Sequence, residues 1–246
     1  MLGKPATRWH AFLIHLALSA IIFIGLASII VLFWYPGFLF KTDGGWQGIR
    51  LIAGIDLVLG PLLTLLVYNP SKKSLTFDLS CIALVQLLAL GYGTHLVYQQ
   101  RPIAVIFADG QFQTASTGSF DFHNIDVNQV DIIRDNPKPV WIWVELPPTL
   151  FNESNIDRNL RIGSAHFWVE GYRHYRENIQ YLKEFGQEQV DDLPKTDANT
   201  RYYSLLSRYN TGYITVNIDN GKSIATYLKD LDDLFQRKST TLDNSK

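Results

Sequence analysis

Apolar residues fill the first hundred positions of the chain in three long runs, over about 11–34, 49–68 and 77–98. The first run is the purest, because no Asp, Glu, Lys or Arg occurs between Arg8 and Lys41. About 20 apolar residues in a helix cross the hydrocarbon of a bilayer, where a helix satisfies its own backbone hydrogen bonds. The pattern therefore predicts an α-helical membrane bundle of three transmembrane helices over residues 1–101.

A cleaved signal peptide is the alternative for the first run, because Lys4 and Arg8 give the chain a basic start. The run is longer than the apolar region of a signal peptide, and no clear small-x-small cleavage site follows it. We interpret it as an uncleaved anchor.

Two residues interrupt the second run. Pro61 lacks a backbone N–H and predicts a kink or a local rearrangement of the helix. Asp56 lies near mid-depth, where an ionised carboxylate costs about 2.5 kcal/mol or more unless it is paired or hydrated. Arg50 is about 240° away around a helix and is a poor partner. Asp56 is therefore the candidate intramembrane functional residue, with pairing between helices as the equal alternative.

Milder polar residues also occur inside the apolar runs: His15 in the first, and Gln86 and His95 in the third. Polar side chains in membrane helices commonly bond to a neighbouring helix. We expect these three to form interhelical hydrogen bonds.

Basic residues indicate the orientation of the bundle. Lys4, Arg8, Lys72 and Lys73 flank one end of the predicted bundle, and Lys41, Arg50 and Arg101 flank the other. The more basic end of a bundle favours the cytoplasm, which places the N-terminus there and residues 102–246 on the other side.

Residues 102–246 have the composition of a globular domain. They carry fifteen Lys/Arg and twenty Asp/Glu, against seven and three in residues 1–101. An acidic domain argues against nucleic-acid binding, which needs a basic surface. Cys81 lies in the third apolar run and is the one cysteine of the chain, so no intramolecular disulfide forms.

Short strands and one helix are predicted in this domain. Residues 103–107 lead into a turn at Asp109-Gly110, and residues 213–219 and 222–228 flank Asn220-Gly221, which suits a type I′ turn. Residues 140–146 form a further strand. Residues 164–182 are predicted as a helix, because apolar residues recur there at steps of three and four. The sequence thus predicts a small α+β soluble domain.

Two tryptophans give the strand 140–146 a candidate partner surface. Trp141 and Trp143 alternate with Ile142, so one face of the strand carries both indoles. We favour the interpretation that both tryptophans belong to the core of the domain. The alternative is that they form an interface with a partner.

Evidence for catalysis or metal binding is weak in this sequence. His166, Glu170, His174 and Glu177 would share one face of the predicted helix, which we interpret as its solvated face rather than a metal site. Neither a phosphate-binding glycine loop nor a Gly-x-Ser-x-Gly motif occurs. We expect no enzyme activity, no cofactor and no metal.

Several motifs at the start of the chain resemble a known family. They are Thr7-Arg8-Trp9, Trp34-Tyr35-Pro36-Gly37-Phe38, Asp43-Gly44-Gly45-Trp46-Gln47-Gly48, Asp56-Leu57-Val58-Leu59-Gly60-Pro61-Leu62-Leu63-Thr64, Gln100-Arg101-Pro102 and Phe107-Ala108-Asp109-Gly110. Together they are similar to the type IV pilin accessory proteins of the TfpX/TfpZ kind, over about the first 115 residues.

The resemblance implies a multi-pass protein of the bacterial inner membrane with a periplasmic C-terminal domain. Such a protein assists the incorporation of a cognate major pilin into type IV pili (fimbrium biogenesis), and the family has no active site to transfer. A pilin-modifying membrane enzyme is one rival, for which Asp43, Arg50, Arg101 and Asp109 are the polar candidates. A periplasmic ligand-sensing membrane protein is the other, although residues 69–74 are too few for a cytoplasmic output domain.

Overall fold

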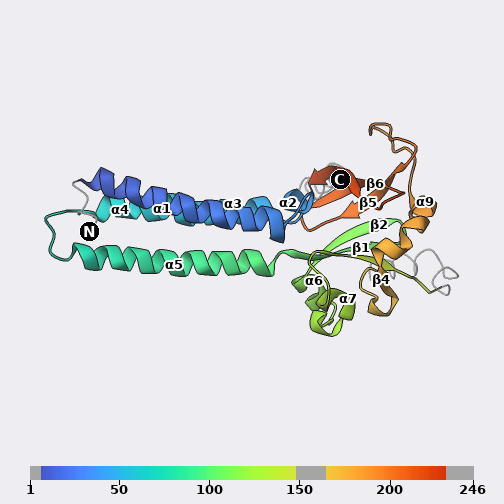
Figure 1. Ribbon diagram of the computed structural model, residues 1–246, viewed down its shortest axis with the longest axis horizontal. Coiled ribbons are helices and arrows are strands. Elements are labelled where there is room, and N and C mark those ends of the chain that lie inside the picture. The colour runs from blue at the N-terminus through green and yellow to red at the C-terminus, as the bar shows by residue number, and fades with distance from the viewer. Residues whose placement is uncertain (1–6, 148–164, 231–246) are drawn as a thin grey trace, which may run out of the picture. The chain divides into compact units, whose positions relative to one another are not determined.

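The computed structural model describes residues 7–147 and 165–230. The chain divides into two compact units, residues 1–100, called here the helical unit, and residues 101–246, called the sheet unit. Figure 1 shows the long helices of the first and the strands of the second.

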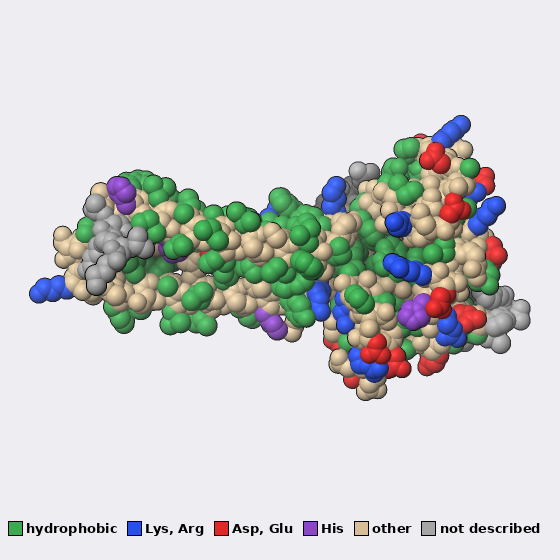
Figure 2. All heavy atoms as spheres, in the orientation of Figure 1, with side chains coloured by type: hydrophobic (Ala, Val, Ile, Leu, Met, Phe, Trp, Pro, Cys, Tyr) green, Lys and Arg blue, Asp and Glu red, His purple; other side chains and the backbone are tan. Residues whose placement is uncertain are grey.

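The helical unit contains three helices that are long and apolar enough to cross a membrane, Arg8–Trp34, Gly45–Val67 and Leu75–Gln99. The first consists of α1 (Arg8–Ile29) and a π turn, η1 (Ile30–Trp34); the short α2 (Leu39–Thr42) follows. The second consists of α3 (Gly45–Ala53), a π turn, η2 (Gly54–Leu59), and α4 (Gly60–Val67), and the third is α5 (Leu75–Gln99). The visible face of these helices is mostly hydrophobic (Figure 2).

The rearrangement predicted at Pro61 is confirmed, and it precedes the proline. The N–H of Gly60 bonds to the carbonyl of Ile55, five residues back, which is the π pattern. Pro61 then lies in the first turn of α4, where its missing N–H costs little.

Ring contacts tie one end of this unit together. The rings of Trp34 and Tyr98 lie 5.0 Å apart, and the hydroxyl of Tyr35 donates to the carbonyl of Val97 at 2.9 Å. The C-terminal ends of the first and third long helices therefore meet, as expected for two helices that run in the same direction.

The sheet unit is a mixed seven-stranded sheet in the order β4-β3-β1-β2-β5-β6-β7. Its strands are β1 (Pro102–Ala108), β2 (Gln111–Ser116), β3 (Val140–Val144), β4 (Tyr172–His174), β5 (Thr200–Leu206), β6 (Asn210–Asn217) and β7 (Ser223–Asp230). β1/β3 and β2/β5 pair parallel, and the remaining neighbours pair antiparallel. Short helices connect the strands: α6 (Thr117–Phe122), η3 (Val127–Gln129), α7 (Asp131–Arg134), η5 (Val169–Gly171), η6 (Tyr175–Tyr181) and α9 (Leu182–Phe185).

Both hairpins predicted from the sequence are present, but the turn of the second differs in type from the prediction. Asp109 and Gly110 both have positive φ, 45° and 82°, as a two-residue type I′ turn requires. The β6–β7 hairpin instead has a five-residue loop, so the type I′ prediction there was wrong. Asn220 does not adopt positive φ; the N–H of Gly221 bonds to the carbonyl of Asn217, and Gly221 alone is left-handed.

The helix predicted over 164–182 was wrong. Ser164 lies outside the described residues, and the rest forms η5, β4 and η6. β4 pairs antiparallel with β3 at the edge of the sheet, so backbone hydrogen bonds across strands replace those of a helix. Apolar steps of three also fit the 3₁₀ helix η6, which has three residues per turn.

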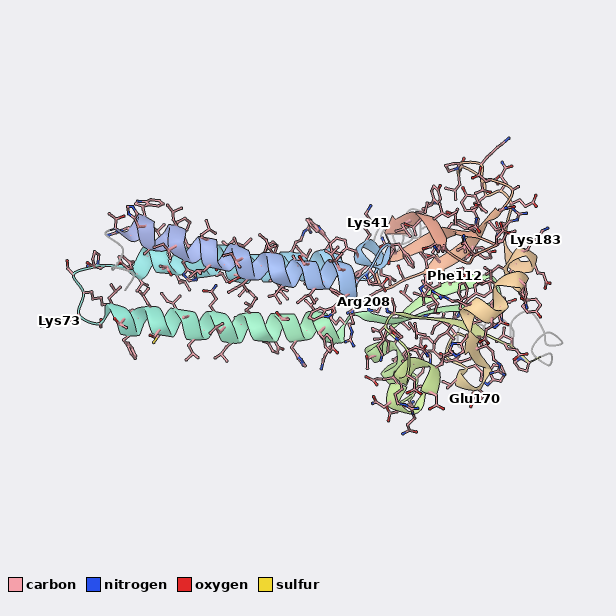
Figure 3. The ribbon with its side chains drawn as sticks, viewed as in Figure 1. Lys41, Lys73, Phe112, Glu170, Lys183 and Arg208 are labelled. Carbon is pink, nitrogen blue, oxygen red and sulfur yellow. The ribbon has the colours of Figure 1, made fainter. Side chains whose placement is uncertain are left out.

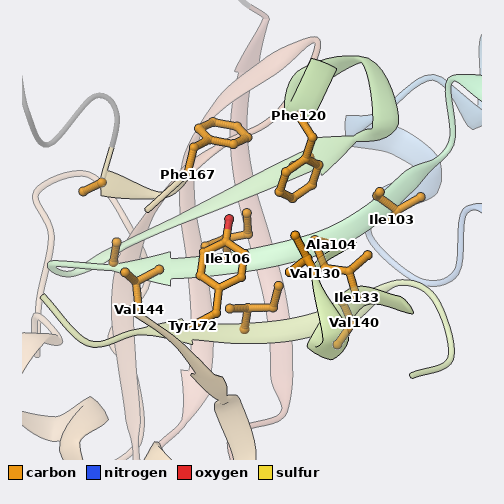
Figure 4. Packing of buried hydrophobic residues seen from close by; sticks show 14 residues of the cluster. Ile103, Ala104, Ile106, Phe120, Val130, Ile133, Val140, Val144, Phe167 and Tyr172 are labelled. Carbon is orange, nitrogen blue, oxygen red and sulfur yellow. The ribbon is translucent and has the colours of Figure 1, made fainter. Parts of the chain in front are cut away.

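Residues of opposite parity along the strands cover the two faces of the sheet. One face packs on α6 and α7, and its core includes Ala104, Ile106, Phe120, Ile133 and Ile142 (Figure 4). The other face carries an aromatic cluster, defined here as Phe107, Phe112, Trp141, Trp143, Tyr175, Tyr181, Phe185 and Tyr203. Because both faces are covered, all seven residues of β1 are buried.

Candidate functional site

Five polar side chains meet inside the helical unit. This polar cluster consists of His15 and Ser19 from α1, Asp56 from η2, Thr64 from α4 and Gln86 from α5. Asp56, Ser19 and Thr64 are buried, with Asp56 only 1% exposed. The cluster therefore connects all three long helices through three buried side chains and the half-buried His15 and Gln86.

Asp56 accepts two hydrogen bonds on one oxygen. Its Oδ1 accepts from the Ser19 hydroxyl at 3.0 Å and from the Gln86 amide at 2.6 Å. Its Oδ2 is buried and has no hydrogen-bond partner among the residues described. A buried polar group is stabilised only by the hydrogen bonds it makes, so Ser19 and Gln86 hold Asp56 in place.

Gln86 is the centre of the cluster. Its Nε2 also lies 3.4 Å from the Ser19 hydroxyl, and its Oε1 accepts from His15 Nε2 at 2.9 Å. His15 Nδ1 lies 2.6 Å from the hydroxyl of Thr64 and can accept its proton. One amide thus links α1, η2 and α5, because its donor and acceptor ends face different helices.

Gly60 provides the space for this amide. A Cβ at Gly60 would lie 2.2 Å from Gln86 Oε1, far inside van der Waals contact. Gly54, on the same long helix, has nothing within 4 Å of such a Cβ. The observed position of the Gln86 amide in the cluster therefore requires glycine at position 60.

The structure brings together some of the residues expected from the sequence. His15 and Gln86 form the predicted interhelical hydrogen bonds, whereas His95 is exposed and forms none among the described residues. Ser19 and Thr64 were missed. Ser19 lies one helical turn from His15, and that spacing was the signal that could have revealed it.

Trp141 and Trp143 lie on one face of β3, in the aromatic cluster. The Trp143 ring is 4.7 Å from that of Phe107 and 5.8 Å from that of Phe185, and the residue is 7% exposed. Trp141 is half-buried, with its ring 5.3 Å from Tyr175. Burial raises the pKa of the Tyr175 hydroxyl above its ordinary value, as expected for an apolar surrounding.

The predicted solvated face of four His and Glu residues does not exist, because the segment is not one helix. His166 is 1% exposed, and its Nε2 lies 3.1 Å from the carbonyl oxygen of Gln111, whereas His174 is exposed in β4. The expectation that both histidines face water was wrong for His166. Within residues 7–147 and 165–230, no three His, Cys, Asp or Glu side chains are grouped as metal ligands.

The polar residues weighed for a membrane enzyme do not converge within their units. Asp43 is buried and accepts from the Thr42 hydroxyl at 2.6 Å, whereas the Arg50 guanidinium lies over the Trp46 ring at 5.0 Å. Arg101 precedes β1 and Asp109 follows it, so the seven-residue strand separates their Cα atoms by roughly 25 Å.

Comparison with known proteins gives three relatives, all from Dichelobacter nodosus. The chain is 39% identical over 107 residues, 43% of its length, to the fimbrial assembly proteins of serogroup E1, of serogroups C1 and C2, and of serogroup I. The match covers 82% of the C1 and C2 protein but 42% of each of the other two, so the chain spans less than half of those relatives. No family model matches the chain, and no solved structure matches it significantly.

Proposed function

Since the chain belongs to the family of the fimbrial assembly proteins, we propose that it is an inner-membrane accessory factor for the assembly of a cognate major pilin into type IV pili. The observation that carries this proposal is the 39% identity to the fimbrial assembly protein of serogroups C1 and C2, because the matched region covers 82% of that protein. The resemblance to the TfpX/TfpZ accessory proteins supports the same role.

The helical unit suits a membrane protein. Its large apolar side chains are mostly turned outward, among them Ile21, Leu66 and Leu88, whereas its polar cluster is inside. Lipid is as apolar as leucine, so this distribution is stable in a bilayer and costly in water. We propose that all three long helices cross the inner membrane.

The proposed orientation has the N-terminus in the cytoplasm and the sheet unit in the periplasm. Lys73, in the connection between α4 and α5, lies at the opposite end of the helical unit from Lys41 (Figure 3). Lys72, beside Lys73, pairs with Asp78 at 2.5 Å. The positive-inside rule assigns the Lys72-Lys73 end to the cytoplasm.

Reporter fusions test this orientation. A fusion after residue 220 should be active as alkaline phosphatase and dark as a cytoplasmic fluorescent protein, and a fusion after Lys73 should behave in the opposite way. The reverse pair of results would refute the orientation and remove the basis for a periplasmic domain.

A pilin subunit consists of a single membrane helix and a periplasmic globular domain, so an accessory factor with both kinds of unit can hold both parts before assembly. Photo-crosslinkers at Ile21, Leu66 and Leu88 place one probe on each long helix. We expect one of them to capture the membrane helix of the major pilin in cells. Crosslinkers at Lys73 in the turn serve as the control. Absence of pilin adducts at all exposed apolar positions would contradict direct contact.

An accessory role leaves the pilin chemically unchanged. Mass spectrometry of the pilin from cells with and without this protein should give identical masses. A mass difference would instead favour the rival in which the protein modifies pilin.

A further inference from the structure

The sheet unit has a pocket of about 560 Å³ beside the aromatic cluster. Trp143, Tyr181 and Phe185 provide its aromatic lining, from β3, η6 and α9 respectively. The Trp143 ring lies 6.2 Å from Tyr181 and 5.8 Å from Phe185. The volume falls in the range of sites for drug-sized molecules, which is too large for a bare ion.

Acidic side chains outnumber basic ones in this pocket. Asp109, Glu145, Glu177 and Glu184 line it together with one cation, Arg173. The Arg173 guanidinium pairs with Glu145 at 2.9 Å, and it also donates to the carbonyls of Glu170 and Tyr172. Glu177 and Glu184 form no ion pair among the described residues. The pocket therefore carries negative charge that its own arginine does not balance.

Trp143 adds an independent observation. The residue is 7% exposed, it lines the pocket, and its indole N–H has no hydrogen-bond acceptor within the part of the chain that the structure describes. This N–H is not one of the fully buried polar atoms that lack a partner, so it is accessible to solvent and can donate a hydrogen bond. A ligand that supplies a carbonyl oxygen would provide an acceptor.

We propose that this pocket binds a lysine or arginine side chain presented by a polypeptide. Carboxylates beside aromatic rings are the combination that recognises organic cations, since the ring face attracts the cation and the carboxylates pair with it. The peptide backbone supplies the carbonyl for Trp143, and a short segment of chain suits the volume. This site lies apart from the polar cluster, and the inference does not depend on the role in fimbrial assembly.

Binding of dye-labelled peptides to the full-length chain in detergent tests the proposal. The probe is acetyl-Ala-Lys-Ala-Lys-Ala-amide, compared at low salt with versions that carry norleucine or glutamate in place of lysine. We expect the lysine probe to bind at least tenfold more tightly than the norleucine probe, and the glutamate probe to bind more weakly still. Equal binding of the lysine and norleucine probes would overturn the proposal.

Charge variants locate the site. Glu177→Gln combined with Glu184→Gln should weaken the lysine probe at least tenfold. The control Asp121→Asn combined with Asp219→Asn removes two exposed carboxylates elsewhere in the sheet unit and should leave binding unchanged. An equal loss in both double variants would mean general attraction to an acidic surface and would refute a specific site.

Arg173→Gln gives a result of opposite sign. A cationic ligand should bind more tightly once the repulsive guanidinium is removed, whereas an anionic ligand would lose its partner. Weaker binding of the lysine probe in a protein with unchanged protease resistance contradicts the proposal. Competition by butylamine distinguishes a free amine from a polypeptide. If butylamine displaces the labelled lysine probe at the same concentration as the unlabelled peptide does, a free amine suffices for binding. That result would refute a polypeptide ligand.

Discussion

The helical unit and the sheet unit distribute polar and apolar side chains in opposite ways. The helical unit buries Asp56, Ser19 and Thr64 and turns large apolar side chains outward, whereas the sheet unit buries rings and places its charges on the surface (Figure 2). The sheet unit thus exposes the charged groups that water solvates, whereas the helical unit exposes the apolar side chains that a lipid surrounding would solvate. The comparison teaches that the two cores are held by different forces: hydrogen bonds between helices in one, and apolar burial in the other.

Removal of the Trp143 ring should have the largest effect, because apolar burial is the main stabilising force in the sheet unit. Trp143→Ala deletes a ring that contacts three other rings and should cost about 3–5 kcal/mol. Trp141→Ala, at a half-buried position, should cost less. Protease resistance and thermal unfolding of the purified protein measure both.

The double change Trp141→Ser with Trp143→Ser separates a core from an interface. A core role predicts a degraded protein in cells. Normal abundance with a loss of pilin crosslinking would instead assign the two indoles to a partner surface.

Gly60→Ala tests the hydrogen-bonded core by overpacking. The added methyl overlaps the Gln86 amide, so this side chain must turn away and give up its hydrogen bonds in the cluster, or α5 must shift, at an expected cost of about 1–3 kcal/mol. Gly54→Ala adds the same methyl into open space and should be neutral or slightly stabilising. Thermal unfolding of both variants in detergent gives the difference; an equal melting temperature would show that the cluster is loosely packed.

Replacement of His166 and replacement of His174 should have different effects on stability, because only His166 is buried. His166→Ala leaves a cavity and removes the contact with the Gln111 carbonyl, and should cost about 1–3 kcal/mol in the sheet unit. His174→Ala changes an exposed side chain and should fall within about 0.5 kcal/mol of the parent protein. Similar stabilities for the two variants would contradict the buried position of His166.

Asp56→Asn should have a small effect on folding and a visible effect on function. The amide keeps Oδ1 as an acceptor for Ser19 and Gln86, so the cost to stability should be below about 1 kcal/mol. Asp56→Leu leaves both donors unpaired and should cost more. We expect fewer surface pili with Asn, fewer still with Leu, and normal membrane insertion with both; electron microscopy and membrane fractionation measure these. Wild-type piliation in both variants would remove Asp56 from the functional residues.

Local signals predicted the strands and turns that depend on few neighbours. Asp109-Gly110 predicted a tight hairpin correctly, because two positive φ angles in succession need such residues. The strand order could not be read from the sequence, because the parallel pairs β1/β3 and β2/β5 join segments separated by long stretches of chain. The segment 164–182 was misjudged since pairing with β3 outweighs a helical apolar spacing.

The candidate site was predictable only in part, for a similar reason. A carboxylate in an apolar run is conspicuous, so Asp56 stood out at once. Ser19 and Thr64 are ordinary residues in apolar helices, and only the folded bundle shows that they meet His15, Asp56 and Gln86. The pocket beside Trp143 was invisible in the sequence, because β3, β4, η6 and the β1–β2 turn all contribute to it.

The π turn η2 changes the phase of the second long helix. In an uninterrupted α-helix, eight residues from Asp56 to Thr64 would rotate the side chain by 80° beyond two full turns, roughly a quarter of the circumference. If the π turn is counted as one inserted residue, seven α-helical steps remain, and the two side chains lie within about 20° of each other. Both then face α1, where His15 and Ser19 are one turn apart. A helical wheel that assumes an uninterrupted α-helix therefore places the residues after Gly60 on the wrong side of this helix. The pattern of exposed and buried residues, measured one residue at a time, should be displaced by one position after Gly60.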